Sequence, residues 1–382
     1  MLFSNILGLE HIKKHLTGTA DKGRIPHAQL FIGKTGYGTL PMAIAYAQYI
    51  LCNNQNGENN GENAACNTKF NNFTHPDLHF AYPVISGKVA SKPKSTDFIA
   101  EWRSFMSANL YGSLYDWYQH LGVKNQQGEI RVQEAADTLK KLSLKSYEGG
   151  FKVSIIWGAD KMNTDCANKL LKLIEEPPNK TLLILIAENE EDILQTIRSR
   201  CQVLQFPPLG EQVIADALVN IDDCTPAEAL KLAHRAQGDY NAALQFLDDD
   251  NGDDIYEEWF IAWVRTAFKA KGNKASIREL ISWSEEIAGV GRESQKRFLL
   301  YCQNFFRQAL MQNYTQGKLV YLEPATKGFQ LEKFAPFVHG NNIIEITEEL
   351  EKAIYHIERN VNAKIVLTDL SIKLTRLLHK KA

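Results

Sequence analysis

The segment 181–187, TLLILIA, is an unbroken apolar run that ends before the acidic stretch ENEED. A strand with apolar side chains on both faces is typical of a parallel sheet that helices cover on both sides. Further strand-like segments at 30–32, 151–157 and 202–206 alternate with segments of helical character. We therefore predict that residues 1–208 form an α/β domain around a parallel sheet.

The segment PPL at 207–209 ends this alternation, and we place a domain boundary there. Residues 209–250 predict a small helical domain and residues 251–382 a larger all-helical domain. In the larger domain, apolar residues recur at spacings of three and four, as in amphipathic helices. These apolar stripes either pack one domain core or lie partly against partner subunits. They comprise Phe298, Cys302, Phe305 and Ala309; Leu350, Ile354, Ile357 and Val361; and Leu367, Leu370, Leu374 and Leu377.

The composition excludes several classes of protein. The net charge of −2 gives no electrostatic argument for or against nucleic-acid binding, so any basic DNA surface has to be local. No apolar run approaches the about 20 residues of a membrane span, and the first residues lack the pattern of a signal peptide. The six cysteines are scattered along the chain, which favours reduced thiols in a cytoplasmic protein over a disulfide framework.

The segment 33–40, GKTGYGTL, follows an apolar strand and precedes an alanine-rich helix. Gly33 and Gly38 match the glycines of the phosphate-binding pattern G-x-x-x-x-G-K-[ST]. Thr39 stands where that pattern has its lysine, and Leu40 where it has the hydroxyl that binds Mg²⁺. We therefore predict a phosphate-loop fold whose nucleotide site is degenerate.

The second element of an ATP site is an apolar strand that ends in acidic residues, which hold Mg²⁺ and orient the attacking water. The strand is present at 151–157, but Trp157 and Gly158 stand at its end. Asp160 follows, and we interpret it as a carboxylate at the N-terminal end of a helix. The sequence thus lacks the magnesium ligands as well as the lysine.

Two further segments, ANKLLKLIEEPP at 167–178 and TIRSRC at 196–201, resemble the clamp-loader ATPases of the AAA+ class. The segments NILGLEHIKKHL, HAQLF, HPDLHF, YEGGFKV and IERNVNAKIVLTDL also look like that family, so the resemblance spans nearly the whole chain. It implies an AAA+-type α/β sheet domain, a small helical lid domain at 209–250 and an all-α collar domain at 251–382. Within the class, the chain is similar to the subunits of the bacterial DNA polymerase III clamp loader.

The resemblance also locates the two nucleotide sensors of the family. The first is a polar Asn or Thr near Glu188, where a carboxylate would repel the γ-phosphate. The second is an arginine, and the equivalent segment GDYNAAL offers Asn241. Every element that would bind ATP in this chain is changed, which implies a subunit released from hydrolysis, with no cofactor of its own.

One element of the family is retained. Ser199-Arg200-Cys201 matches the Ser-Arg-Cys signature, whose arginine contacts ATP bound by the neighbouring subunit. A guanidinium is always charged and presents a rigid fork of donors to phosphate oxygens. The resemblance therefore implies that Arg200, with Ser199 beside it, completes a neighbour's active site. The alternative is that Arg200 only pairs with a carboxylate such as Glu175 or Glu176.

Zinc-bearing members of the family place four cysteines where this chain has Cys52 and Cys66, on either side of an Asn-rich loop. A structural zinc site needs four ligands, mostly Cys or His. His75 and His79 complete such a set on paper, but the motif HPDLH that holds them also occurs in relatives that use four cysteines. We predict no metal site.

Two segments have the residue types that contact DNA. The segment 130–145 predicts a helix, and Arg131 near its start matches family positions that face primer-template phosphates. The insertion at 97–121 is rich in aromatic residues, which either stack on bases or pack into the core. We favour packing for the insertion, and Arg131 is a weakly marked candidate for phosphate contact.

These inferences predict a stator-like clamp-loader subunit that does not hydrolyse ATP. The partners implied by the resemblance are the ATPase subunits of gamma/tau type, the delta subunit, the sliding clamp and primed DNA. Two rival interpretations remain open. One is an ATP-hydrolysing motor subunit with an unusual loop, and the other is a DNA-binding scaffold without a role in ATP turnover.

Overall fold

The computed structural model describes residues 2–52, 64–86, 93–123, 128–147, 150–220, 224–248, 252–315, 320, 324, 326, 328–359 and 361–381. The Asn-rich loop at 53–63 and the expected boundary at 250 lie outside these residues. The chain divides into two compact units, residues 1–245 and 246–382. The helices after residue 209 belong to the first unit up to residue 245, so a lid domain distinct from the sheet domain stays a prediction.

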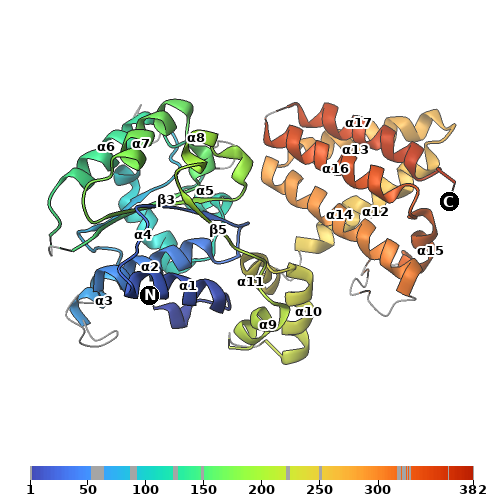
Figure 1. Ribbon diagram of the computed structural model, residues 1–382. Helices are drawn as coiled ribbons and strands as arrows, with labels where there is room; N and C mark the ends of the chain where they lie inside the picture. The colour runs from blue at the N-terminus through green and yellow to red at the C-terminus, as the bar shows by residue number, and fades with distance from the viewer. Residues whose placement is uncertain are drawn as a thin grey trace. The chain divides into compact units, whose positions relative to one another are not determined.

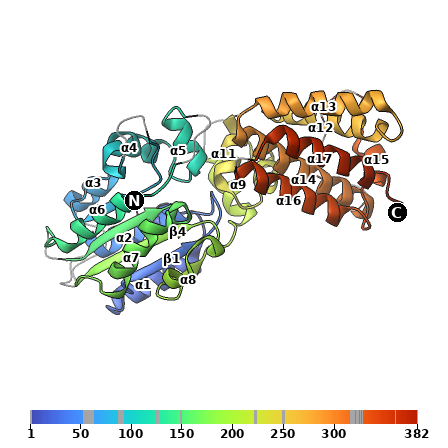
Figure 2. The ribbon, with the colours of Figure 1, turned by 90° about the horizontal axis from the view of Figure 1, so that it is seen from above.

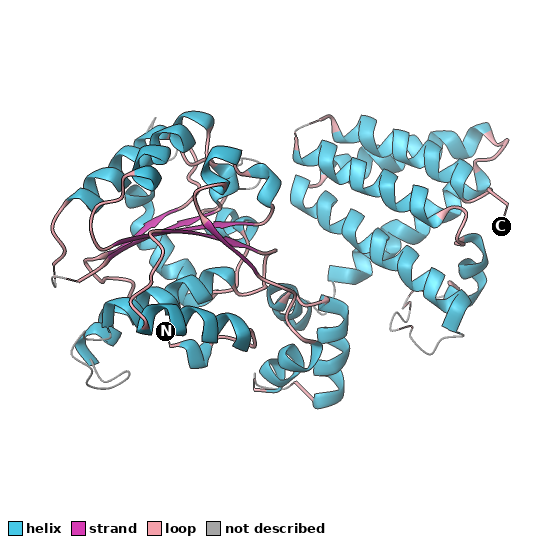
Figure 3. Cartoon of the chain, viewed as in Figure 1, coloured by secondary structure: helices cyan, strands magenta, loops and turns pink. Residues whose placement is uncertain are grey.

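A parallel sheet lies at the centre of the first unit (Figure 3). In the described residues it has five strands in the order β2-β3-β4-β1-β5, and every neighbouring pair is parallel. On β1, which lies between β4 and β5, Leu30 pairs with Leu185 of β4 and with Val203 of β5. The strands are β1 Ala28–Ile32, β2 Leu78–Ala81, β3 Lys152–Trp157, β4 Thr181–Ala187 and β5 Gln202–Gln205.

Helices cover both faces of this sheet (Figure 1). On one face, alternate residues of β1 and β4 pack with α6, α7 and α8 in a single hydrophobic cluster. On the other face lie α1 and α2. The predicted strands at 30–32, 151–157, 181–187 and 202–206 are confirmed, and β4 is buried at every position. The expected fold class, a parallel-sheet α/β domain followed by helices, is confirmed.

The helices of the first unit begin after the short 3-10 turn at Phe3–Asn5. The helix predicted at 130–145 is confirmed as α6. At the start of α7, the Asn163 side chain accepts a hydrogen bond from the N–H of Cys166 and so caps the helix. The helices are α1 Glu10–Asp21, α2 Thr39–Cys52, α3 Ala64–Asn71, α4 Ile99–Ala108, α5 Leu114–His120, α6 Val132–Ser143, α7 Thr164–Glu175, α8 Gln195–Arg198, α9 Glu211–Val219, α10 Pro226–Ala236 and α11 Tyr240–Asp248.

The aromatic insertion forms α4 and α5 and packs into the core. Trp102 and Trp117 are fully buried, with their ring centroids 5.5 Å apart. Trp102 also stacks on Tyr82, which follows β2, at 4.0 Å. The prediction that these aromatic residues pack is therefore confirmed, and the two buried tryptophans are closed to nucleic-acid bases.

The second unit is all-helical, as predicted. Its long helices α13, α14, α16 and α17 lie alongside one another (Figure 2). The predicted apolar stripes lie in one hydrophobic core, with the exception of Val361, which is exposed because it follows the end of α16. The helices are α12 Gly252–Lys269, α13 Lys274–Gly289, α14 Arg292–Thr315, α15 Leu331–Phe334, α16 Ile343–Glu358 and α17 Ala363–Leu377.

Among the helices that the structure describes, none combines the length and the apolar character needed to cross a membrane. The expectation of reduced thiols is wrong for one pair, because the structure joins Cys52 and Cys66 in a disulfide. Both residues are close to the Asn-rich segment, at the end of α2 and in α3, and their Cα atoms are 5.7 Å apart. The other four cysteines are free thiols.

Candidate functional site: the phosphate loop and its surroundings

The phosphate loop lies between β1 and α2, as the sequence predicts. Gly36 and Gly38 have positive φ angles of 74° and 88°, which glycine adopts without steric cost. Thr39 begins α2 and is buried, and a Cβ on Gly33 would lie 2.9 Å from its methyl group. Leu40 is also buried. The fold of the loop is therefore present, but Thr39 and Leu40, the first residues of α2, carry no charge.

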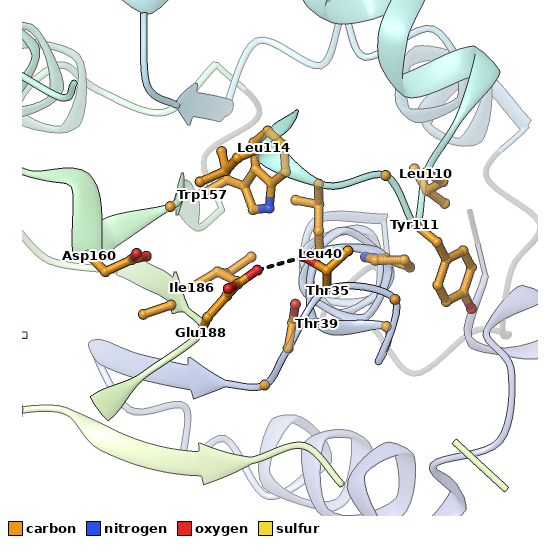
Figure 4. Close-up of a pocket in the computed structure, with 17 residues that line it drawn as sticks. Thr35, Thr39, Leu40, Leu110, Tyr111, Leu114, Trp157, Asp160, Ile186 and Glu188 are labelled. Atoms are coloured by element: carbon orange, nitrogen blue, oxygen red, sulfur yellow. Dashed lines mark hydrogen bonds between the residues drawn. The ribbon is translucent and has the colours of Figure 1, made fainter. Parts of the chain in front are cut away.

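A pocket opens over this loop (Figure 4). Its lining includes the loop itself, the ends of β3 and β4, Leu110 and Tyr111 between α4 and α5, and Leu114 at the start of α5. The space left for water amounts to about 30 Å³, which is room for only a few water molecules. The insertion thus fills much of the region that lies in front of the loop.

Trp157, at the end of β3, stands where a magnesium-binding carboxylate is expected. Its side chain is only 6% exposed and packs against Trp102 and Phe105 of α4, at centroid distances of 5.3 and 6.0 Å. The nearby Asp160 lies in a short 3-10 turn, and its carboxylate pairs with Lys161 at 2.7 Å. The end of β3 is therefore part of an aromatic core.

Glu188, at the expected first-sensor position, directly follows β4. Its Oε1 accepts a hydrogen bond of 2.6 Å from the Thr35 hydroxyl in the phosphate loop (Figure 4). The carboxylate thereby lies against the loop whose backbone would otherwise face a phosphate. Because like charges repel, a phosphate at this position would be destabilised by Glu188.

Asn241, at the expected second-sensor position, is 3% exposed. Its Oδ1 accepts a hydrogen bond from Asn109 at 2.9 Å, and its Nδ2 donates one to Asp116 at 2.8 Å. Both ends of its amide are thus occupied by the insertion. The structure thus brings Trp157, Glu188 and Asn241 close to the degenerate phosphate loop, within the first unit.

Asp239, beside Asn241, is an ionisable group that the sequence analysis did not single out. Burial raises the pKa of its carboxyl to about 7, and the charges of Glu188 and Asp116 act in the same direction. Hydrogen bonds from the backbone N–H groups of Ala242 and Asn241 oppose this shift. Asp239 is therefore only partly ionised at neutral pH.

The raised pKa of Asp239 predicts a pH-dependent stability. The folded state retains the Asp239 proton to a higher pH than the unfolded chain, which releases it near pH 4. The protonated carboxyl therefore adds to the free energy of unfolding. This stabilisation is fully present below about pH 4 and is lost as the pH rises through about 7. We expect Asp239→Asn to be more stable than the natural protein at pH 8 by about 1–3 kcal/mol, and to lose that advantage toward pH 4. Urea unfolding at pH 4.5, 6 and 8 measures this; a pH-independent difference would contradict it.

Arg200 lies outside this pocket, after α8. Its guanidinium pairs with Glu175 at the end of α7 at 2.9 Å and donates to the carbonyl of Thr196 at 3.0 Å. The Arg200 side chain is 42% exposed. Ser199 donates its hydroxyl to the same carbonyl at 3.2 Å. The ion pair that the sequence analysis gave as the alternative is therefore present in the isolated chain.

Arg131 immediately precedes α6. Its Nε pairs with Glu129 at 3.0 Å, and its guanidinium also donates to the Ser86 hydroxyl. The side chain is 26% exposed. The guanidinium is thus held by contacts within the chain, and its contact with DNA stays a prediction.

The cysteines expected near a zinc site, Cys52 and Cys66, are bonded to each other, which removes both as thiolate ligands. His75 is buried, and burial lowers the pKa of His79 to about 4, so that its imidazole is neutral at pH 7. The described part of the chain holds no group of three or more His, Cys, Asp and Glu side chains suited to a metal ion.

Known proteins match the same region of the chain. Residues 8–210, which contain the sheet and the phosphate loop, match the family described as DNA polymerase III, delta subunit. The chain belongs to this family. The predicted similarity to the subunits of the bacterial DNA polymerase III clamp loader is confirmed, and several relatives of the chain are delta' subunits.

The similar proteins include the DNA polymerase III subunit delta' of Bacillus subtilis, which is 30% identical over 58% of this chain and 54% of its own length. The subunit delta' of Pseudomonas aeruginosa is 29% identical over 54% of this chain and 50% of its own length. The replication factor C small subunit of Halobacterium salinarum is 28% identical over 50% of this chain and 58% of its own length. The chain spans about half the length of these relatives.

Sequence reasoning missed the part that the insertion plays at the site. Asn109, Leu110, Tyr111 and Asp116 come from a segment that the sequence marks only as aromatic-rich. No sequence pattern links this segment to the phosphate loop, which is about 70 residues earlier. The link arises because α4 and α5 pack across the ends of β2 and β3.

Proposed function

We propose that this chain is a subunit of the bacterial DNA polymerase III clamp loader that does not hydrolyse ATP itself. The observation that carries this proposal is the pocket over the phosphate loop. Its space of about 30 Å³ is far below the several hundred Å³ of ordinary ligand sites. Thr39 and Leu40 supply neither the charge nor the accessible hydroxyl that Mg-ATP needs, and the Glu188 carboxylate lies against the loop.

In the same proposal, Arg200 completes the ATP site of a neighbouring subunit. Its ion pair with Glu175 is no obstacle, because both side chains are more than 40% exposed and exposed ion pairs contribute only about 0–1 kcal/mol. A phosphate offers the guanidinium charge-assisted, paired hydrogen bonds. Arg200 would therefore exchange Glu175 for a phosphate when a neighbour presents one.

The proposed partners are ATPase subunits of gamma/tau type and the delta subunit, with the sliding clamp and primed DNA reached through the complex in the cytoplasm. The delta' names of the relatives support this assignment. In the proposal, α12–α17 form the collar that joins the neighbouring subunits. Arg131 would contact DNA only after leaving Glu129 and Ser86.

Binding of Mg-ATP to the full chain tests the loss of the nucleotide site. By isothermal titration calorimetry we expect no binding in the micromolar range. Micromolar binding of Mg-ATP would overturn the proposal and favour an active motor subunit. Absence of binding would have two possible causes: the side chains that fill the pocket, and the missing lysine and hydroxyl of the phosphate loop.

A double variant separates these two causes. Thr39→Lys with Leu40→Thr restores the two missing groups of the phosphate-loop pattern. We expect its dissociation constant for Mg-ATP to stay above about 1 mM, because Trp157, Leu110 and Glu188 still occupy the site. Micromolar binding by this variant would show that the two side chains alone account for the loss.

A further inference from the structure

We propose that the segment 109–116, between α4 and α5, replaces bound nucleotide as the group that holds α11 against the phosphate loop. The position of α11 would then be independent of nucleotide. This inference goes beyond the proposed function, because it requires neither Arg200 nor a neighbouring subunit. It rests on two sets of contacts within residues 1–245.

The first set is a hydrogen-bond network, which we call the Asn241 network: Asn109, Asp116, Asn241 and Gln245. The Asn109 amide donates to Asn241 at 2.9 Å, and Asn241 donates to Asp116 Oδ2 at 2.8 Å. One turn further along α11, Gln245 donates to Asp116 Oδ1 at 3.1 Å. Two side chains of α11 are thus bound to one carboxylate of the insertion.

The Asp116 carboxylate is held in position before it meets α11. It accepts hydrogen bonds from the backbone N–H and the hydroxyl of Ser113, at 2.8 and 2.6 Å, in the capping box that begins α5. Hydrogen bonds to an ionised acceptor are about twice as strong as neutral ones. An anion on the protein itself thereby contacts the helix that carries the expected sensor position.

The second set joins the start of α11 to the phosphate loop. The backbone N–H of Tyr240 donates to the carbonyl of Gly36 at 3.3 Å. A Cβ on Gly36 would lie 1.8 Å from Asp239 Oδ1, so the two segments are in direct contact. The Tyr240 ring packs edge-on against Tyr111 at 5.0 Å, and the hydroxyl of Tyr111 accepts from the N–H of Leu7 at 3.0 Å.

The insertion therefore both lines the pocket and binds α11. Leu110 and Tyr111 line the pocket over the loop, while Asn109 and Asp116, on either side of them, bind α11. A ligand shifts a conformational equilibrium only through different affinities for the two states. Because α11 already contacts the phosphate loop directly and is bound by the segment 109–116, nucleotide has no comparable contact to add.

Hydrogen–deuterium exchange of the full chain tests this inference. In the natural protein, we expect the amides of α11 to exchange at the same rate with and without 5 mM Mg-ATP. Asn241→Ala removes both side-chain contacts of Asn241 and is expected to speed the exchange of α11 amides by about tenfold or more. Gln245→Ala removes one contact and should give a smaller increase.

The matched control is Asn220→Ala, at the end of α9. The Asn220 side chain donates an exposed hydrogen bond to the carbonyl of Asp216 in its own helix, so α11 exchange should be unchanged in this variant. Exchange of β4 amides, at the centre of the sheet, reports whether the first unit of each variant is folded. If Asn241→Ala does not fold, Gln245→Ala alone decides the question.

Two results would overturn the inference. One is α11 exchange at the rate of the natural protein in every folded variant of the network. The other is a slower exchange of α11 when Mg-ATP is added to the natural protein. If calorimetry detects Mg-ATP binding while α11 exchange is unchanged, the proposed function is contradicted and this inference is supported.

Discussion

Arg200→Ala should lower ATP hydrolysis at the neighbouring subunit's site by about 10³-fold or more in a reconstituted clamp loader. Arginine residues that contact ATP across an interface contribute about 10³–10⁵ to the rate of phosphoryl transfer. Assembly should be unaffected, because the Arg200 side chain is 42% exposed and packs in no core. Single-turnover ATP hydrolysis measures the effect: the kinetic phase from the ATP site that Arg200 completes should be lost.

The matched control is Arg24→Ala, which removes an exposed arginine from the same unit and should leave hydrolysis unchanged. Arg200→Lys keeps the charge but loses the rigid fork of donors, so we expect an intermediate rate. Hydrolysis by the Arg200→Ala loader at the full rate would remove the proposed role of Arg200. The chain would then be a scaffold with no part in ATP turnover.

Trp102→Ala should destabilise the first unit by about 3–5 kcal/mol, the usual cost of replacing a buried aromatic residue by alanine. Trp102 is fully buried and packs against Tyr82, Trp117 and Trp157, with centroid distances of 4.0, 5.5 and 5.3 Å. Its loss would leave a cavity between the insertion and the end of β3. Urea unfolding followed by far-UV circular dichroism measures the change.

Tyr147→Ala is the control for this substitution, because Tyr147 is 77% exposed. A change at such a surface position is expected to stay within about 0.5 kcal/mol. An equally small change for Trp102→Ala would mean that the insertion packs only loosely on the sheet. The filling of the pocket by Leu110 and Tyr111 would then lose its structural support.

The sheet was predictable where apolar runs mark its strands, most clearly at 181–187. The run at 181–187 became β4 because a strand buried on both faces needs apolar residues at every position. The strand β2, Leu78–Ala81, was not predicted, since it is short and His79 interrupts its apolar pattern. Its place in the sheet is fixed by pairing with β3, which lies far along the chain.

The degenerate loop was also predictable, because Thr39 and Leu40 differ chemically from the residues that bind phosphate and magnesium. The disulfide between Cys52 and Cys66 was not, since two cysteines in a large chain carry no sign of their distance in space. The occupied pocket was equally hidden. Leu110 and Tyr111 look like ordinary core residues until α4 and α5 are placed over the loop.

The sequence by itself determined the chemistry that is absent from this protein: Thr39, Leu40 and Trp157 stand where lysine, hydroxyl and carboxylate would bind Mg-ATP. Residue identity decides that point, because a missing charge or ligand is missing in any fold. Only the tertiary structure decided which residues lie in front of the phosphate loop. Asn109 and Asp116 contact Asn241 across more than 120 positions of the chain, and contacts at that separation come from packing, which local sequence patterns do not encode.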